Sequence, residues 1–137
     1  MRLDALLRAH GFMRVERPPQ LWEADTDDLT FIPLLGEMIA ACLARGGVLE
    51  ELTLNVSNVT ALDPDPGGLP PGDYVGVTVS GRVAWEAEAT WQPTRPWQQP
   101  WLDDLSGRLA PAGARYAYIR KLPDRGSITV FLARSGT

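Results

Sequence analysis

The sequence predicts an α+β domain in which an antiparallel sheet of about five strands, including two hairpins, carries two or three helices on one face. Three observations lead to this fold class. The apolar residues recur with a period near 3.6 before Gly46-Gly47 and with a period of two after it. Two pairs of alternating segments are each joined by a short turn sequence. The chain has 137 residues, of which 45% are hydrophobic, so a single globular domain over residues 1–137 is expected.

Three segments have the apolar spacing of amphipathic helices. The first is residues 3–7, which Gly11 ends. The second, from about residue 29 or 31 to Arg45, is expected to be the main core helix because Gly46-Gly47 supplies a stop. Its predicted core stripe is Ile32, Leu35, Ile39 and Leu43, widened by Met38 and Cys42. The third helix runs to about Leu109 on the stripe Trp101, Leu102, Leu105 and Leu109.

The strands are predicted from alternation and from turn residues. Residues 13–22 are expected to be extended, as a short strand or a strap, because Pro18-Pro19 excludes a helix. Residues 51–59 form a strand with one covered face, formed by Leu52, Leu54 and Val56. Residues 63–73 are rich in proline and glycine, which predicts a loop.

Two hairpins complete the predicted sheet. The first joins residues 74–80 to residues 83–91 through Gly81-Arg82. The second joins residues 114–121 to residues 127–133, and its Pro-Asp-x-Gly turn places Gly126 in the left-handed conformation. The resulting order of helices and strands resembles that of the small α+β chaperones of type III secretion, which implies an export chaperone as one possible function.

Charge is distributed unevenly and limits the classes of partner. The net charge is −4, with −7 in residues 1–73 and +3 in residues 74–137. An acidic first half argues against nucleic acid and suits a basic protein partner. The chain shows neither a signal-peptide pattern nor an apolar run long enough for a membrane span, so a cytoplasmic location without membrane contact is expected.

Residues able to carry chemistry are few. One cysteine, Cys42, and one histidine, His10, lie in different segments, so we expect no metal site, no cofactor and no catalytic triad, and Cys42 is interpreted as a small core residue. The acidic cluster Asp25, Asp27 and Asp28 precedes a helix, which explains it better than a cation site does.

Four tryptophans lie within seventeen positions, interleaved with prolines. Packing accounts for Trp85, Trp91 and Trp101, whereas Trp97 has no periodic partner and is therefore a candidate for an exposed binding patch.

These observations favour a protein without enzymatic activity that binds another protein. The leading hypothesis is a bacterial immunity or inhibitor protein, in which Asp25, Asp27, Asp28 and Trp97 contact a basic toxin or effector. A second hypothesis is a small-molecule-binding domain or minor enzyme, with a pocket between sheet and helices lined by Trp85, Tyr116 and Tyr118. An export chaperone is a third, and a structural subunit that forms homo-oligomers through an open sheet face is a fourth.

Overall fold

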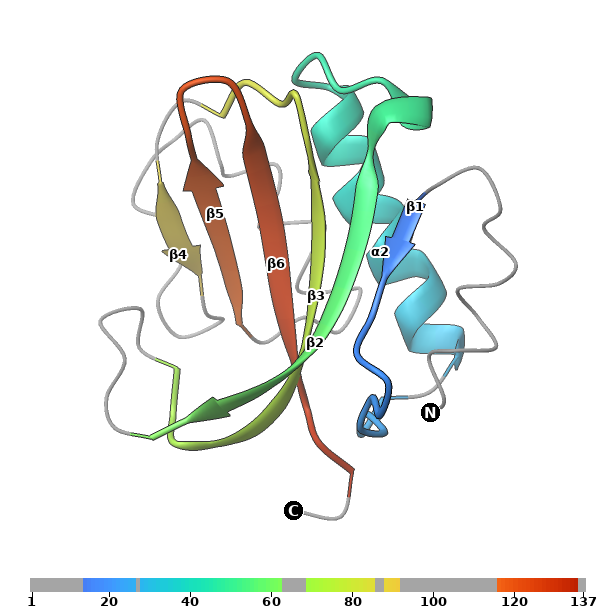
Figure 1. The fold of residues 1–137 in the computed structure, drawn as a ribbon, viewed down its shortest axis with the longest axis vertical. Helices are drawn as coiled ribbons and strands as arrows, with labels where there is room; N and C mark the ends of the chain where they lie inside the picture. Colours follow the sequence, from blue (N-terminus) through green and yellow to red (C-terminus); the bar gives the residue numbers. More distant parts are fainter. Residues whose placement is uncertain (1–13, 27, 63–68, 86–87, 92–115, 136–137) are drawn as a thin grey trace.

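The computed structural model describes residues 14–26, 28–62, 69–85, 88–91 and 116–135. Within them one helix packs on a six-stranded sheet with the strand order β1-β2-β3-β6-β5-β4 (Figure 1). The elements are β1 (Arg14–Glu16), α2 (Asp28–Leu43), the 3-10 helix η1 (Leu49–Glu51), β2 (Thr53–Ala61), β3 (Gly72–Gly81), β4 (Ala89–Trp91), β5 (Ala117–Lys121) and β6 (Gly126–Ala133).

The predicted α+β class with a mostly antiparallel sheet is confirmed. The sheet is mixed, because β1 pairs in parallel with β2 while the other neighbouring strands are antiparallel. The predicted helices at residues 3–7 and 101–109 lie outside the described residues.

The main helix was predicted at the right place, and its buried face was predicted in part: Leu35, Met38 and Cys42 are buried, and Ile39 packs against the core. The side chains that pack into the core are Phe31, Leu34, Leu35, Met38, Ala41 and Cys42. Ile32 and Leu43 of the predicted stripe are instead 47% and 41% exposed. The spacing did not fix the centre of the buried face because α2 is apolar almost all the way round, so overlapping stripes on neighbouring sides of the helix fit a helical period.

The predicted stop at Gly46-Gly47 is confirmed. Gly46 has φ = 86°, a conformation that glycine adopts without steric cost, and the Gly47 N–H donates to the carbonyl of Cys42 at 3.0 Å. The carbonyl of Arg45 accepts a hydrogen bond from the Ala84 N–H at 3.0 Å. The end of α2 is thereby tied to the segment that follows β3.

The first predicted hairpin is wrong. β3 lies between β2 and β6, and β4 pairs with β5 at the far edge of the sheet. Gly81-Arg82 does not reverse the chain, because residues 83–85 cross the end of β6. At this crossing an added Cβ at Gly126 would lie 2.6 Å from the Val83 carbonyl oxygen. Local alternation and a short glycine turn therefore identified strand residues without identifying their partner.

The second predicted hairpin is confirmed, with one correction in its turn. β5 and β6 pair antiparallel, and the Leu122 N–H donates to the carbonyl of Arg125 at 2.8 Å. Gly126 does not have a positive φ, because the left-handed glycines of the described chain are Gly46 and Gly72. Glycine is needed at position 126 because residues 83–85, the crossing segment, pass close to its backbone, and not because of its φ angle.

The extended segment after β1 forms the predicted strap. The Trp22 N–H donates to the side-chain oxygen of Asn58 at 2.9 Å, and the Asn58 amide donates to the carbonyl of Gln20 at 2.7 Å. The guanidinium of Arg134 lies 4.1 Å from the centroid of the Trp22 ring and 3.1 Å from Asp73. Trp22 is half-buried against the core, so the strap closes one end of the layer between α2 and the sheet.

Within the described residues, no helix is long and apolar enough to cross a membrane.

Candidate binding surface

The face of the sheet opposite α2 carries short, neutral polar side chains. Strand alternation directs the apolar residues of β2, β3, β6 and β5 toward α2 and directs the other half of each strand away from it. We call the neutral polar residues of the second set the polar face; they are Thr53, Asn55, Ser57, Thr78, Ser80, Ser127, Thr129 and Tyr118, and the exposed Arg120, which pairs with Ser127, borders them. All residues of the polar face are half-buried, and none is charged.

The strand register aligns the polar face into a row across the sheet. Asn55 pairs with Thr78, Thr78 with Thr129, and Thr129 with Tyr118. The hydroxyl oxygens of Thr78 and Thr129 are 2.7 Å apart, at hydrogen-bond distance. Because neighbouring strands are about 4.8 Å apart, this row spans about 14 Å. At its β1 end, Asn55 donates to the carboxylate of Glu16 at 3.4 Å.

One end of the polar face is aromatic. The ring of Tyr74 makes edge contacts with Tyr116 and Phe131, with centroids 6.1 and 6.4 Å apart. The Tyr74 hydroxyl donates to the carbonyl of Pro70 at 2.7 Å. Burial, and then the neighbouring Tyr116, raise the pKa of Tyr74. Leu69, next to Pro70, is buried as well.

The pocket suggested by the sequence is not formed by its three aromatic residues. Trp85 is buried in the core on the α2 side, with the Arg45 guanidinium 4.4 Å from its ring centroid. Tyr116 and Tyr118 lie on the opposite face, because Ala117 and Ile119 between and beside them point into the core. The three rings therefore do not line one cavity.

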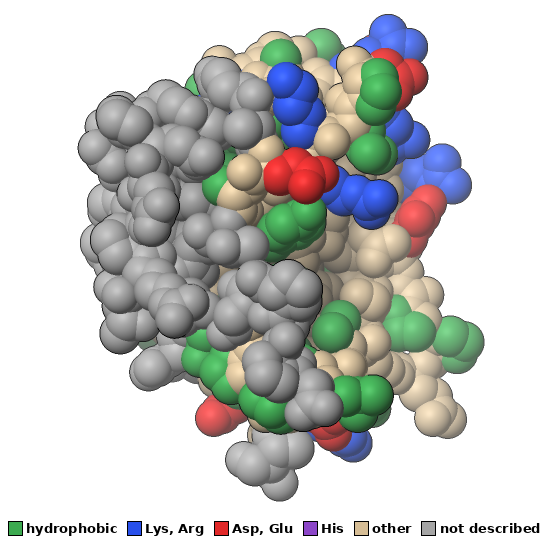
Figure 2. Space-filling model, turned by 90° about the vertical axis from the view of Figure 1, so that its left-hand side faces the viewer, with side chains coloured by type: hydrophobic (Ala, Val, Ile, Leu, Met, Phe, Trp, Pro, Cys, Tyr) green, Lys and Arg blue, Asp and Glu red, His purple; other side chains and the backbone are tan. Residues whose placement is uncertain are grey.

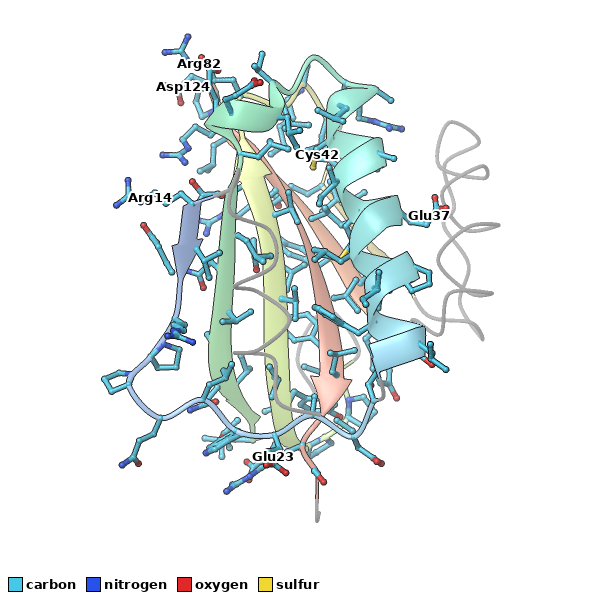
Figure 3. All side chains as sticks on the ribbon, turned by 90° about the vertical axis from the view of Figure 1, so that its right-hand side faces the viewer. Arg14, Glu23, Glu37, Cys42, Arg82 and Asp124 are labelled. Atoms are coloured by element: carbon cyan, nitrogen blue, oxygen red, sulfur yellow. The ribbon has the colours of Figure 1, made fainter. Side chains whose placement is uncertain are left out.

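An open depression of about 450 Å³ lies at the end of the molecule that carries the β5–β6 turn. Its lining residues are Glu51, Gly81, Arg82, Asp124 and Arg125. Figure 2 shows that basic and acidic side chains are mixed at this end, and Figure 3 shows Arg82 and Asp124 there. Since its charged side chains are exposed and of both signs, the depression does not select a ligand of one charge.

The four residues proposed from the sequence as contacts are placed only in part. Asp25 is exposed, and its N–H donates to the carbonyl of Ala133 at 2.7 Å. Asp28 is the first residue of α2, as expected for an acid at a helix N-terminus, but its side chain is not described. Asp27 and Trp97 lie outside the described residues. The structure therefore does not test whether these four residues form a contact surface.

Acidic side chains of the first half do not gather on one face of the described structure. Figure 3 shows Glu23 at the end of the sheet below the strap and Glu37 beside the middle of α2. Glu51 lines the depression at the opposite end. In the described part of the chain, no group of three or more His, Cys, Asp or Glu side chains is arranged to hold a metal ion.

Cys42 is a buried core residue, as the sequence predicted. Burial raises the pKa of its thiol from 9.0 to about 12, although Arg45 acts in the opposite direction. Because the folded pKa lies above the unfolded one, the associated stabilisation is complete below about pH 9 and is lost as the pH rises toward 12.

Iodoacetamide should therefore alkylate Cys42 in the folded protein at least about a hundredfold more slowly than in the unfolded chain, since only the thiolate attacks. Mass spectrometry of samples labelled near neutral pH, with and without denaturant, measures both rates. Equal rates in the two samples would show that the thiol is accessible.

Sequence reasoning identified the alternating residues of β2 but not the polar face as a unit. The usable indication is that the outward half of β2, β3 and β6 contains Ser, Thr and Asn where a solvated sheet commonly has Lys and Glu. The alignment of these residues depends on the pairing of β3 with β6, which no local pattern gives.

Comparison of the chain with protein-family models, with curated proteins and with solved structures finds no match in any of the three.

Proposed function

We propose that this domain binds another protein without catalysing a reaction, and that the polar face is its binding surface. The observation that carries the proposal is the uncharged row Asn55, Thr78, Thr129 and Tyr118 across four strands. Short hydroxyl and amide side chains lose little conformational entropy on binding, and the row itself contains no charge that would have to be desolvated. Tyrosine adds a large rigid contact area, as it does in antibody paratopes.

The class of partner that we propose is a basic toxin or effector, which makes the domain an immunity or inhibitor protein. The support is the net charge of −4 and the excess of acids in the first half of the chain. Such a field accelerates association with a basic partner even when the acids lie outside the contact. Asp25, exposed beside the strap, belongs to this steering set, and we retain Asp27, Asp28 and Trp97 as proposed contacts.

Thr129→Arg should weaken partner binding by about tenfold or more, because it places a long charged side chain in the middle of the row. The experiment co-expresses the domain with the product of each neighbouring reading frame and measures the affinity of any complex. Ala84→Arg is the matched control, since Ala84 is exposed in the segment after β3 and lies outside the polar face. Thermal unfolding of both variants verifies the fold. A folded Thr129→Arg protein with unchanged affinity would exclude the polar face.

Association and dissociation rates of the same complex distinguish residues that steer the partner electrostatically from residues that contact it. Asp25→Lys should slow association at low salt and leave dissociation almost unchanged, whereas a contact residue changes dissociation. Trp97→Ala should accelerate dissociation if the ring lies in the interface. An Asp25→Lys protein that associates at the same rate at low salt would show that steering through this acid is wrong.

A further inference from the structure

The outer side of α2 is as apolar as its buried side. Asp28, Thr30 and Glu37 are the only polar side chains among its 16 residues. The side chains opposite the core form what we call the outer stripe; they are Leu29, Ile32, Pro33, Gly36, Ala40 and Leu43, continued by Ala44. At 3.6 residues per turn, these seven positions fall within about 120° of the helix circumference. No charged residue interrupts them.

The outer stripe is exposed to solvent except at Ala40, which is half-buried. Leu29 is 85% exposed, Ile32 47% and Leu43 41%, and a Cβ added at Gly36 would have no atom of the described residues within 4 Å. Among the described elements, α2 packs on β3 and β6, and Figure 3 shows the sheet on one side of it only. A helix on the surface of a monomer normally has polar residues on its solvent side. A continuous apolar stripe there indicates an interface.

We infer that the outer stripe is a homodimer interface, in which α2 packs antiparallel against α2 of a second copy. The order of residue sizes along the stripe supports this occupant. With the two-fold axis midway between Gly36 and Ala40, Gly36 of one copy faces Ala40 of the other, so the backbones can approach closely. At the same register Ile32 faces Ala44, and Leu43 faces Pro33. Two of the three bulky side chains, Ile32 and Leu43, thus meet a smaller one, which is the arrangement that packs without voids.

A parallel pair of helices does not have this complementarity. Leu29, Ile32 and Leu43 would each face their own copy, and the two helix dipoles would be aligned rather than opposed. The stripe also has sufficient length, because 16 residues at 1.5 Å each extend about 24 Å. Two such stripes in contact bury on the order of 1,000 Å² in total, which is the lower limit for a specific interface.

The oligomeric state tests the inference. Sedimentation equilibrium of the full chain at micromolar concentrations should show a dimer, and Leu43→Glu should raise the dissociation constant by about tenfold or more. Leu122→Glu is the matched control, since Leu122 is 42% exposed in the β5–β6 turn and should leave the dimer intact. A monomeric wild-type protein, or a dimer that withstands Leu43→Glu, would overturn the inference and leave the stripe to a different partner.

Disulfide cross-linking tests the antiparallel register. Unlike Leu43→Glu, it introduces no charged side chain that could disturb the fold. A mixture of chains carrying Gly36→Cys with chains carrying Ala40→Cys should form covalent dimers faster than either variant alone. The buried native Cys42 does not compete for oxidation. Faster cross-linking of a single variant than of the mixture would contradict the antiparallel register. These experiments involve α2 alone, so they neither require nor test the polar face.

Discussion

Replacing Trp85 with alanine should lower the free energy of unfolding by about 4 kcal/mol, the range measured for buried large aromatic residues. Trp85 is 2% exposed, and it joins the crossing segment after β3 to the end of α2. Its ring lies under the Arg45 guanidinium at 4.4 Å and beside Gly126. Truncation would therefore remove apolar burial and the cation–π contact together. Urea unfolding monitored by far-UV circular dichroism gives the change.

Trp85→Phe is the informative control for this prediction. The indole N–H of Trp85 is buried and has no hydrogen-bond partner in the described part of the chain, so the phenylalanine side chain removes a polar group that costs free energy to bury. Trp85→Phe should therefore destabilise by much less than Trp85→Ala. If the two variants were equally unstable, the indole N–H would have to make a favourable contact, and the explanation based on burial alone would be wrong.

Gly126→Ala should lower the free energy of unfolding by about 3 kcal/mol, because a methyl group must be inserted where the chain crosses itself. The added Cβ would lie 2.6 Å from the Val83 carbonyl oxygen and 2.6 Å from Cδ1 of Trp85. A backbone carbonyl cannot move aside without displacing the crossing segment. The expected result is a lower urea midpoint with an unchanged slope, since the extent of unfolding should be the same.

Ser127→Ala provides the comparison on the neighbouring residue. Ser127 is half-buried on the polar face, so the loss of its hydroxyl should change stability by about 1 kcal/mol at most. Equal stability of Gly126→Ala and the wild-type protein would show that the crossing segment can shift at little cost. The close approach would then not explain why glycine occupies this position.

The sequence was sufficient where structure depends on near neighbours. The glycine stop after α2, the exposed and buried residues of β2 up to Val56, and the hairpin of β5 and β6 follow from residues close in the chain. The sequence was insufficient where a strand could pair with any of several strands that are distant in the chain. The segment after Gly81 was predicted to pair with β3 in a hairpin, yet it continues past β6 and forms β4 at the edge of the sheet.

The two candidate surfaces, the polar face and the outer stripe, were likewise predictable only as far as local sequence patterns determine them. Alternation placed Thr53, Asn55 and Ser57 on a polar side of β2, but their continuation across Thr78 and Thr129 required the register between strands. The helical period of α2 allowed two apolar stripes, and only tertiary packing selects the one that faces the sheet. Asp27 and Trp97, two of the residues proposed from the sequence, lie outside the described residues and stay predictions.

The parallel pairing of β1 with β2 has a consequence for the order in which the chain folds. Arg14 pairs with Thr53, although α2 and η1 lie between β1 and β2 in the sequence. We therefore expect β1 to pair with β2 only after α2 and η1 have reached their places. Closing such a long loop costs conformational entropy, and three paired residues offset only a small part of that cost. The β2–β3 and β5–β6 pairs are joined by shorter connections, so their closure costs less entropy. We therefore expect β1 and the strap to be the last part of the sheet to form. They should also be the first part to open in the folded protein, because β1 has only three paired residues and Pro18 and Pro19, which follow it, have no N–H to extend the pairing.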